Sequence, residues 1–257
     1  MSKISLICKD NIAYLVLNRA EKHNALTQSM WQQIAEACDK LVQEIKPRVL
    51  IIESTSNKAF SAGADIQELQ MFLNTPTKLQ ENNQSVKQAQ QKITELPFAT
   101  IAKINGLCFG GGLGIAMACD FRLATPQSCF AITPAKLGLV YSIEDTRRLI
   151  NLIGYAKAKE MLYSGKKIMA DVAMQWGLLS DLVEANNLDE EVDKLVTNLC
   201  AASRYSIAAV KQTIEYVVDG SAKKETSIRE LFDKAFVGDD FKEGAQAFLQ
   251  KRLAKFD

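Results

Sequence analysis

The sequence predicts an α/β fold with a parallel core, followed by a helical C-terminal part. Before Leu188, short β-rich runs alternate with helical stripes of apolar residues. This alternation is typical of strands joined by right-handed helical crossovers, with the helices packed outside. From Leu188 onward the stripes are almost wholly helical, as at Ile207, Val210, Ile214 and Val217. We therefore expect a core over residues 1–190 and a helical subdomain over residues 191–257.

The first elements are strands and one long helix. The β-rich runs Ile4–Cys8 and Ile12–Leu17 flank the turn-forming sequence Lys9-Asp10-Asn11, which indicates an opening hairpin. A helical stripe covers Thr27–Ile45 and stops before a proline. The apolar run Val49–Ile52 then predicts a buried strand.

The next elements lead to a cluster of glycines. Residues 57–71 read as a loop and a short helix, and Gln80–Leu96 reads as a polar helix. Phe98–Ile104 predicts a second buried strand. The glycine-rich segment that follows this strand is one of two segments that carry the functional argument.

Composition limits the function classes. The 257 residues are 47% hydrophobic and 24% charged, which is typical of a soluble globular protein with one main domain. The 31 basic and 30 acidic residues give no electrostatic footprint for nucleic acid. The apolar runs are too short to span a membrane, and charges interrupt the first residues before a secretory signal can form. We expect a cytoplasmic protein that contacts neither nucleic acid nor membrane.

Metal and nucleophile chemistry have little support in the sequence. The six cysteines are scattered without a C-x-x-C pair, so neither a metal site nor disulfides are expected. His23 is the single histidine and lies in a polar turn, which disfavours a Ser-His-Asp or Cys-His mechanism. No cofactor is expected.

Two segments have the composition of loops that a ligand can approach closely. Segment 59–66, AFSAGADI, follows a predicted strand with small residues, and Asp65 is placed to cap the next helix. Segment 104–114, INGLCFGGGLG, ends a strand and opens a helix, so its N–H groups point outward at a positive helix end. Together they can aim two N–H donors at one thioester oxygen and stabilise an enolate.

Two other interpretations of the glycines stay open. Glycines also permit tight packing of a helix on a strand. Gly110, Gly112 and Gly114 mimic part of a dinucleotide-binding turn, but they come late in the chain and lack a downstream carboxylate for a ribose.

Several separated motifs, in one order, resemble the enoyl-CoA hydratase/isomerase (crotonase) superfamily over nearly the whole chain. They are NRAEKHNAL, AFSAGADIQEL, INGLCFGGGLGIAMACDFRLAT, FAITPAKLGL, the block from LIGYAKAKEM to GLLSDLV, and FKEGAQAFLQKR. The resemblance implies a spiral core of ββα turns with a C-terminal helical oligomerisation subdomain. It also implies an acyl-coenzyme A thioester as substrate, with coenzyme A part of that substrate, and a homotrimer or hexamer.

The resemblance also implies roles for individual residues. The oxyanion donors would be the N–H groups of Ala64 and Gly111. Substrate and coenzyme A would be bound at positions distributed over the chain: His23, Asn24 and Ala25 near the adenine, Ala62, Asp65 and Ile66 along the channel, Pro134 and Leu137, and Phe248 and Lys251 from a neighbouring subunit.

The acid–base residues depart from the family pattern. Adding water to a conjugated thioester needs two positioned carboxyl groups. The family's two glutamates correspond here to Gly114 and Pro134, and a carboxylate found in other relatives corresponds to Ser142. Glu144 is the leading replacement and Asp145 the second, although Ser142 with Asp145 also reads as a helix cap.

Four functions remain as hypotheses. The first is a lyase or isomerase that stabilises a thioester enolate, assisted by Glu144, Asp145 or Tyr141. The stretch TPAKLGLVYS resembles methylmalonyl-CoA decarboxylase, which places Tyr141 in the site of a decarboxylase. The alternatives are a non-catalytic acyl-CoA binder, because both glutamates are missing, and a structural protein that interacts through its C-terminal helices.

Overall fold

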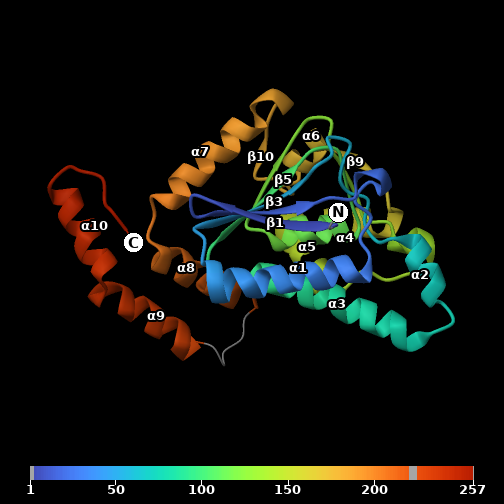
Figure 1. The fold of residues 1–257 in the computed structure, drawn as a ribbon, viewed down its shortest axis with the longest axis horizontal. Coiled ribbons are helices and arrows are strands. Elements are labelled where there is room, and N and C mark those ends of the chain that lie inside the picture. The colour runs from blue at the N-terminus through green and yellow to red at the C-terminus, as the bar shows by residue number, and fades with distance from the viewer. Residues whose placement is uncertain (1–2, 220–224, 257) are drawn as a thin grey trace.

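The computed structural model describes residues 3–219 and 225–256, and two sheets form its centre. The larger sheet has the strand order β1-β2-β3-β5-β7-β10, and the smaller sheet has the order β4-β6-β8-β9. Helices cover both faces of the larger sheet, with α1 and α3 on one side and α7 on the other (Figure 1). The mixed α/β fold with a parallel core is confirmed.

The opening hairpin is confirmed as well. Strands β1 (Ile4–Lys9) and β2 (Ile12–Leu17) pair antiparallel, and Lys9 faces Ile12 across the turn. The two turn residues, Asp10 and Asn11, have φ of 51° and 65°. Positive φ at both positions matches the right-handed twist of a hairpin, and Asp and Asn tolerate it better than most residues.

Successive ββ units build the spiral, because each turn gives one strand to each sheet. Strands β3 (Val49–Ser54), β5 (Ala99–Ile104) and β7 (Phe121–Ala124) lie parallel in the larger sheet. Each is followed by a short strand in the smaller sheet, namely β4 (Ala59–Ser61), β6 (Leu107–Phe109) and β8 (Cys129–Ala131). The ends of β4 and β6 carry the two segments singled out in the sequence.

The edge strands and the helices complete the architecture. Strand β9 is Ile168–Met169, and β10 is Asp181–Leu182. The helices between the strands and beyond them are α1 (Gln28–Lys40), α2 (Ile66–Phe72), α3 (Pro76–Glu95), α4 (Gly111–Ala118), α5 (Ile143–Ser164), α6 (Ala170–Gln175), α7 (Leu188–Cys200), α8 (Arg204–Asp219), α9 (Glu225–Val237) and α10 (Asp239–Leu249).

Two helices differ from their predicted bounds. The predicted helix Thr27–Ile45 begins after Thr27, whose side chain caps it, and changes to a π-turn at Leu41–Ile45. The polar helix starts at Pro76, before the predicted Gln80, because a proline at the first helical position has a suitable φ and no N–H to leave unpaired.

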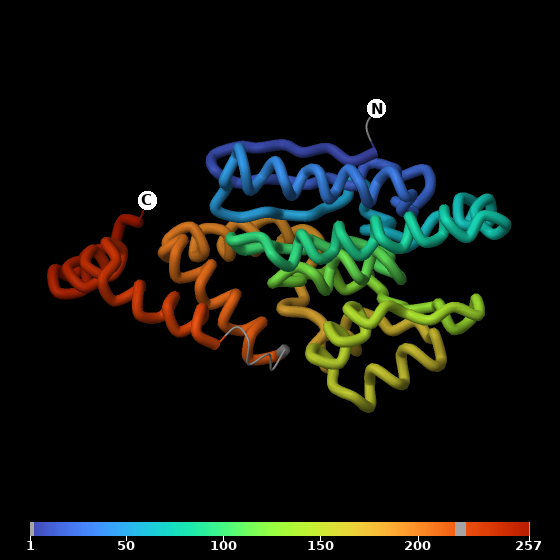
Figure 2. Tube along the Cα trace, turned by 90° about the horizontal axis from the view of Figure 1, so that it is seen from below, coloured from blue at the N-terminus to red at the C-terminus, as the bar shows by residue number. Residues whose placement is uncertain are grey.

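The C-terminal helices are of two kinds. Val192 and Val196 of α7 are buried against the larger sheet with Val49, Ile101 and Leu123. Helices α8 to α10 form a C-terminal extension. Helix α8 is tied to the core, where Lys211 pairs with Asp120, while α9 and α10 reach away from the sheets at the end opposite α2 (Figures 1 and 2). Apolar side chains are exposed on this extension: Val210, Ile214, Val217, Phe232, Phe236, Phe241, Phe248 and Leu249. The division at residue 190 stays a prediction.

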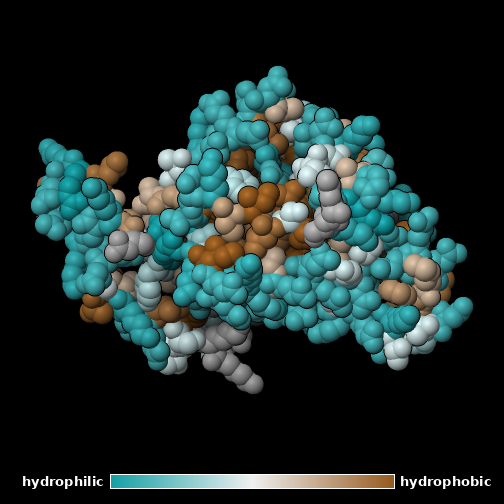
Figure 3. Space-filling view, viewed as in Figure 1, coloured by the Kyte–Doolittle hydropathy of each residue, from teal (hydrophilic) through white to brown (hydrophobic). Residues whose placement is uncertain are grey.

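The face drawn in Figure 3 is mostly polar, and four of the six cysteines are buried. Apolar surface is concentrated near the middle of the face drawn in Figure 3 and is otherwise mostly interspersed with polar side chains. Within residues 3–219 and 225–256, no helix is long and apolar enough to cross a membrane. All six cysteines are free thiols, and burial raises the pKa of Cys38 and of Cys119 to about 12.

Candidate functional site

The two predicted loops touch each other at their glycines. A Cβ placed on Gly63, after β4, would lie 3.0 Å from the carbonyl oxygen of Phe109 and 3.5 Å from the nitrogen of Gly111. Gly63 has a φ of +93°, which side-chain-bearing residues rarely adopt. The absence of a side chain at this position therefore lets the β4 loop approach the first residue of α4.

The N–H of Ala64 points to the side of its loop that faces away from Leu26. The carbonyl of Gly63 accepts from the Leu26 N–H at 2.7 Å, and the Asp65 N–H donates to the Leu26 carbonyl at 2.9 Å. In a trans peptide the N–H points opposite to the preceding carbonyl. The Ala64 N–H is therefore directed away from Leu26, and the residue is only half-buried.

The N–H of Gly111 lies at the N-terminus of α4. Gly110 precedes the helix with φ 47° and ψ −115°, and its own N–H is held by the Ala131 carbonyl at 2.9 Å. The first N–H groups of a helix have no partner inside it, and the helix dipole adds positive potential there. Gly111 is half-buried, whereas residues 112–118 of α4 are buried.

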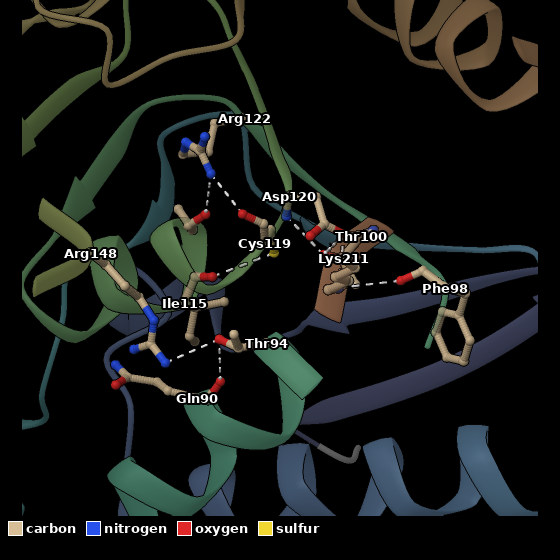
Figure 4. Close-up of polar contacts among 11 residues, drawn as sticks. Gln90, Thr94, Phe98, Thr100, Ile115, Cys119, Asp120, Arg122, Arg148 and Lys211 are labelled. Carbon is tan, nitrogen blue, oxygen red and sulfur yellow. Dashed lines mark hydrogen bonds and ion pairs between the residues drawn. The ribbon is translucent and has the colours of Figure 1, made fainter. Parts of the chain in front are cut away.

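Packing fixes both loops. A Cβ on Gly111 would lie 2.9 Å from the Trp31 ring, and one on Gly112 would lie 2.6 Å from Cβ of Ser61. At its C-terminus α4 is held by Arg122, whose guanidinium donates to the Cys119 carbonyl at 2.7 Å (Figure 4). The same guanidinium also donates to the Leu178 carbonyl at 2.8 Å. The helix that presents Gly111 is thus held at both ends.

The predicted channel residues form the wall beside β4. Asp65 caps α2 by accepting from the Glu68 N–H at 3.1 Å, as predicted, and it pairs with Arg19 at 2.6 Å. Partial burial alone would raise the pKa of Asp65, but Arg19 and backbone N–H groups outweigh it and lower that pKa. Ala62 is half-buried and Ile66 is exposed at the start of α2.

The segment around His23 is tied to the same wall. Asn24 is fully buried, and its side chain donates to Ser54 Oγ at 2.7 Å and to the carbonyls of Ala59 and Phe60 at 3.1 Å. His23 is exposed and Ala25 is half-buried. The Asn24 side chain therefore has a structural function, and adenine recognition by the backbone of residues 23–25 stays a prediction.

Tyr141 lies against the turn that opens α4. Its hydroxyl donates to the Gly110 carbonyl at 3.1 Å, the same carbonyl that accepts from the Gly114 N–H at 3.0 Å. Burial raises the pKa of Tyr141 well above its usual value, and the nearby Asp145 raises it further. Tyr141 is therefore a neutral phenol next to the proposed oxyanion position.

Pro134 and Leu137 border the segment that leads to Tyr141. They form the short 3-10 helix η3 (Pro134–Leu137), in which Pro134 is half-buried and Leu137 is exposed. The following residues expose further apolar side chains at Leu139 and Val140. An apolar segment of this kind suits contact with an acyl group.

Glu144 and Asp145 point in different directions from the start of α5. Ser142 caps the helix by accepting from the Asp145 N–H at 3.0 Å, as the capping interpretation predicted. Glu144 pairs with Lys87 of α3 at 2.9 Å, and this bond lowers its pKa. Asp145 is 2% exposed and turns inward toward α4.

The two C-terminal candidates lie far from these loops within one chain. Phe248 is 83% exposed near the end of α10, and Lys251 follows it with a φ of 54°. In both views α10 lies at the opposite end of the molecule from α2 (Figures 1 and 2). Their contact with coenzyme A on a neighbouring subunit stays a prediction.

Three side chains at the site were not singled out from the sequence. Trp31 lies behind Gly111, while Gln90 of α3 and Arg148 of α5 lie beside Asp145. Of the three, only Arg148 could have been found from the sequence. It follows Asp145 by three positions, and residues with this spacing share one face of a helix. Within the described parts of the chain, no group of three or more His, Cys, Asp or Glu residues is placed to hold a metal ion.

Comparisons with known proteins agree with this geometry. The family model for enoyl-CoA hydratase/isomerase matches residues 8–257. A crotonyl-CoA hydratase of Syntrophomonas wolfei is 31% identical, over 96% of this chain and 95% of its own length. The crystal structure of an enoyl-CoA hydratase/isomerase family protein from Hyphomonas neptunium is 35% identical with a TM-score of 0.94, covering 100% of this chain and 98% of its own.

A second solved structure extends the likeness to a more distant sequence. An enoyl-CoA hydratase from Bacillus anthracis is 26% identical, with a TM-score of 0.92 over 99% of both chains. The motifs, the two-sheet spiral and these matches lead to one conclusion. The chain belongs to the enoyl-CoA hydratase/isomerase family.

Proposed function

We propose that the chain is an acyl-coenzyme A enzyme that holds a thioester oxygen between the N–H groups of Ala64 and Gly111 and so stabilises an enolate. The observation that supports this most directly is the contact between the Gly63 loop and the Gly111 nitrogen, at 3.5 Å from the position of a Cβ on Gly63. Two donors fixed before the reaction stabilise developing charge without reorganisation. The α-proton of the thioester then becomes removable, which is the common step of lyase and isomerase chemistry on such substrates.

The surroundings of the two donors support an acyl thioester as substrate. Ala62, Ala64 and Gly111 are half-buried and carry little or no side chain, so a ligand can approach the backbone. The exposed Leu137, Leu139 and Val140 offer apolar surface for an acyl group. The relative from Syntrophomonas wolfei is named for crotonyl-CoA, which makes a short enoyl thioester the first probe.

The carbonyl stretch of a bound thioester tests the proposal directly. Crotonyl-CoA labelled with ¹³C at the carbonyl is expected to show a lower C=O stretching frequency when bound, because two N–H donors polarise the bond. Infrared difference spectroscopy against the unlabelled ligand isolates this band. A bound thioester whose carbonyl band stays at its solution frequency would contradict the proposal. Binding of the thioester without a shift of its carbonyl band would indicate a binding protein rather than an enzyme.

Decarboxylation is a second candidate, and one observation favours it. Tyr141 lies at the turn that opens α4, where its hydroxyl donates to the Gly110 carbonyl at 3.1 Å. Loss of carbon dioxide from a 2-carboxyacyl thioester leaves the same enolate, so it uses the same two N–H donors. Release of carbon dioxide from malonyl-CoA or methylmalonyl-CoA, measured beside the crotonyl-CoA assay, separates the two reactions.

Self-association through α8 to α10 completes the proposal. Exposed Phe236, Phe248 and Leu249 on this extension are the kind of surface that subunits cover. We expect a trimer or hexamer by light scattering. A monomer at micromolar concentration would contradict this expectation and would leave Phe248 and Lys251 without a route to the site.

A further inference from the structure

An amide from α3 and a carboxylate from α5 together fill the space beside α4 where Gly114 has no side chain. A Cβ on Gly114 would lie 3.1 Å from Oδ2 and 3.2 Å from Oδ1 of Asp145. Gly114 follows Gly111 by three residues, which is about 4.5 Å along a helix axis. The Asp145 carboxylate therefore lies beside the residue that follows, by about one helical turn, the Gly111 N–H that would bind the thioester oxygen.

Arg148 holds this carboxylate in place and is itself held by a residue of α3. Arg148 donates from Nη1 to Asp145 Oδ1 at 3.0 Å and from Nη2 to Thr94 Oγ1 of α3 at 3.0 Å. The second of these bonds is drawn in Figure 4. The Asp145 side chain is 3% exposed and that of Arg148 is 17% exposed, so the pair is shielded from most solvent. A group fixed on two helices in this way keeps a constant position.

The side chain of Gln90 packs beside the same carboxylate and against Gly114. Gln90 is 2% exposed, and its Nε2 lies 2.2 Å from the position of a Cβ on Gly114. Its amide lies close enough to Asp145 to lower the pKa of that carboxyl, yet Nε2 makes no hydrogen bond of normal geometry to any residue described here. The Gln90 amide therefore favours the charged form of Asp145, which is the form that a base needs.

The charged surroundings of Asp145 suit a base. Burial raises its pKa, and Arg148, Ser142 and Gln90 lower it, with a net pKa above the ordinary value of 3.8. The other groups that face it are Tyr141, neutral and with a raised pKa, and the uncharged backbone of α4 at Gly114. A carboxylate whose pKa lies closer to neutrality is a stronger base in its ionised form.

We propose that Asp145 is the catalytic base of this site and that it moves the α-proton of the bound thioester, with Arg148 as its positioning residue. This inference rests on the proposed function. The C–H bond at the α-carbon breaks, an O–H bond forms on Asp145, and the electron pair moves onto the thioester oxygen held by Ala64 and Gly111. The same carboxyl then returns the proton to the α-carbon or to the γ-carbon of a 3-enoyl thioester.

One carboxylate limits the reaction to proton relocation. Glu144 faces Lys87 with a 37% exposed side chain, so it does not supply a second group beside Gly114. Water addition needs one group to activate water and another to protonate the α-carbon. A 3-enoyl-CoA is therefore the substrate class expected for this site, with the conjugated 2-enoyl-CoA as product.

The test follows α-proton exchange of butyryl-CoA in D₂O by mass spectrometry, beside conversion of 3-butenoyl-CoA to crotonyl-CoA. Asp145→Asn is expected to slow both by about 100-fold or more, as for loss of a general base. The carbonyl band of ¹³C-labelled crotonyl-CoA bound to Asp145→Asn should shift as it does in the wild type. Asp120→Asn is the matched control, since it removes a charge paired with Lys211 at 2.9 Å outside the site, and it should stay within about threefold of wild type.

The pH profile separates a base from a structural carboxylate. Activity of the wild type should fall as pH decreases through the pKa of Asp145, and this acidic limb should be absent in Asp145→Asn. Arg148→Gln removes a cation that lowers that pKa, so the limb should move to higher pH. If Asp145→Asn does not fold, the move of the acidic limb to higher pH in Arg148→Gln still shows that the base is Asp145.

The outcomes distinguish this inference from the proposed function. Wild-type exchange rates in Asp145→Asn, a comparable loss in Glu144→Gln instead, or 3-hydroxybutyryl-CoA as the main product would each overturn the role of Asp145. So would a shifted carbonyl band without any exchange in the wild type. An unshifted band in the wild type would overturn the oxyanion site itself.

Discussion

Gly63→Ala is expected to lower the rate of α-proton exchange or turnover by about 100-fold or more, which corresponds to loss of one oxyanion donor. The new methyl group would lie 3.0 Å from the Phe109 carbonyl oxygen and 3.5 Å from the Gly111 nitrogen. The two loops would have to separate, and the positive φ at Gly63 adds strain. kcat/KM and the infrared shift of the bound carbonyl should decrease together.

Gly177→Ala is the matched control for this substitution. Gly177 has a φ of +82°, and a Cβ there would lie 3.0 Å from the Leu152 carbonyl oxygen. It thus combines a similar positive φ with a similar contact, but in the turn after α6. The Gly177→Ala variant should lose about as much stability as Gly63→Ala, while the infrared shift of the bound carbonyl persists. Equal kinetic losses in both variants would mean that Gly63 acts through stability alone.

Arg122→Met is expected to reduce the free energy of unfolding by about 3 kcal/mol, because buried carbonyls at the end of α4 and after α6 lose their donor. Arg122 is 6% exposed, and burial lowers its pKa. Its bonds to the carbonyls of Cys119 and Leu178, at 2.7 and 2.8 Å, place a cation at the C-terminus of α4. Urea denaturation followed by circular dichroism measures the change.

Arg122→Lys provides the comparison. A lysine keeps the positive charge at the helix end but lacks the planar fork that reaches two carbonyls at once. It should therefore lose less stability than the methionine variant. A loss below about 1 kcal/mol in Arg122→Met would show that the carbonyls find other partners, since each unpaired buried acceptor costs about 1–3 kcal/mol.

Much of the fold and the backbone part of the site could be predicted from local sequence. Asp10 and Asn11 mark a tight turn through their tolerance of positive φ, and Asp65 and Ser142 mark helix starts through their capping oxygens. The glycines of the two loops indicate close approach of backbone segments, because glycine is the only residue without a Cβ. Each of these signals lies within a few neighbouring residues.

The acid–base part could not be read in the same way. The replacement for the side chain absent at Gly114 comes from Asp145 on a different helix, and its direction depends on how α4 and α5 pack. Glu144, one residue earlier, looks like the better candidate in sequence but pairs with Lys87 outside. Gln90 belongs to a polar helix whose pattern does not reveal which amide is buried. Such choices are set by packing between elements.

The chain carries two tryptophans, and the contact of Trp31 with Gly111 gives one of them a spectroscopic use. The Trp31 ring is 2% exposed and lies 2.9 Å from the position of a Cβ on Gly111. Trp176 instead lies near the ammonium groups of Lys157 and Lys166, at 4.6 and 5.3 Å from its ring centre. The fluorescence of Trp31, isolated by Trp176→Phe, is therefore an intrinsic signal for binding of a ligand at Gly111, and it needs no label.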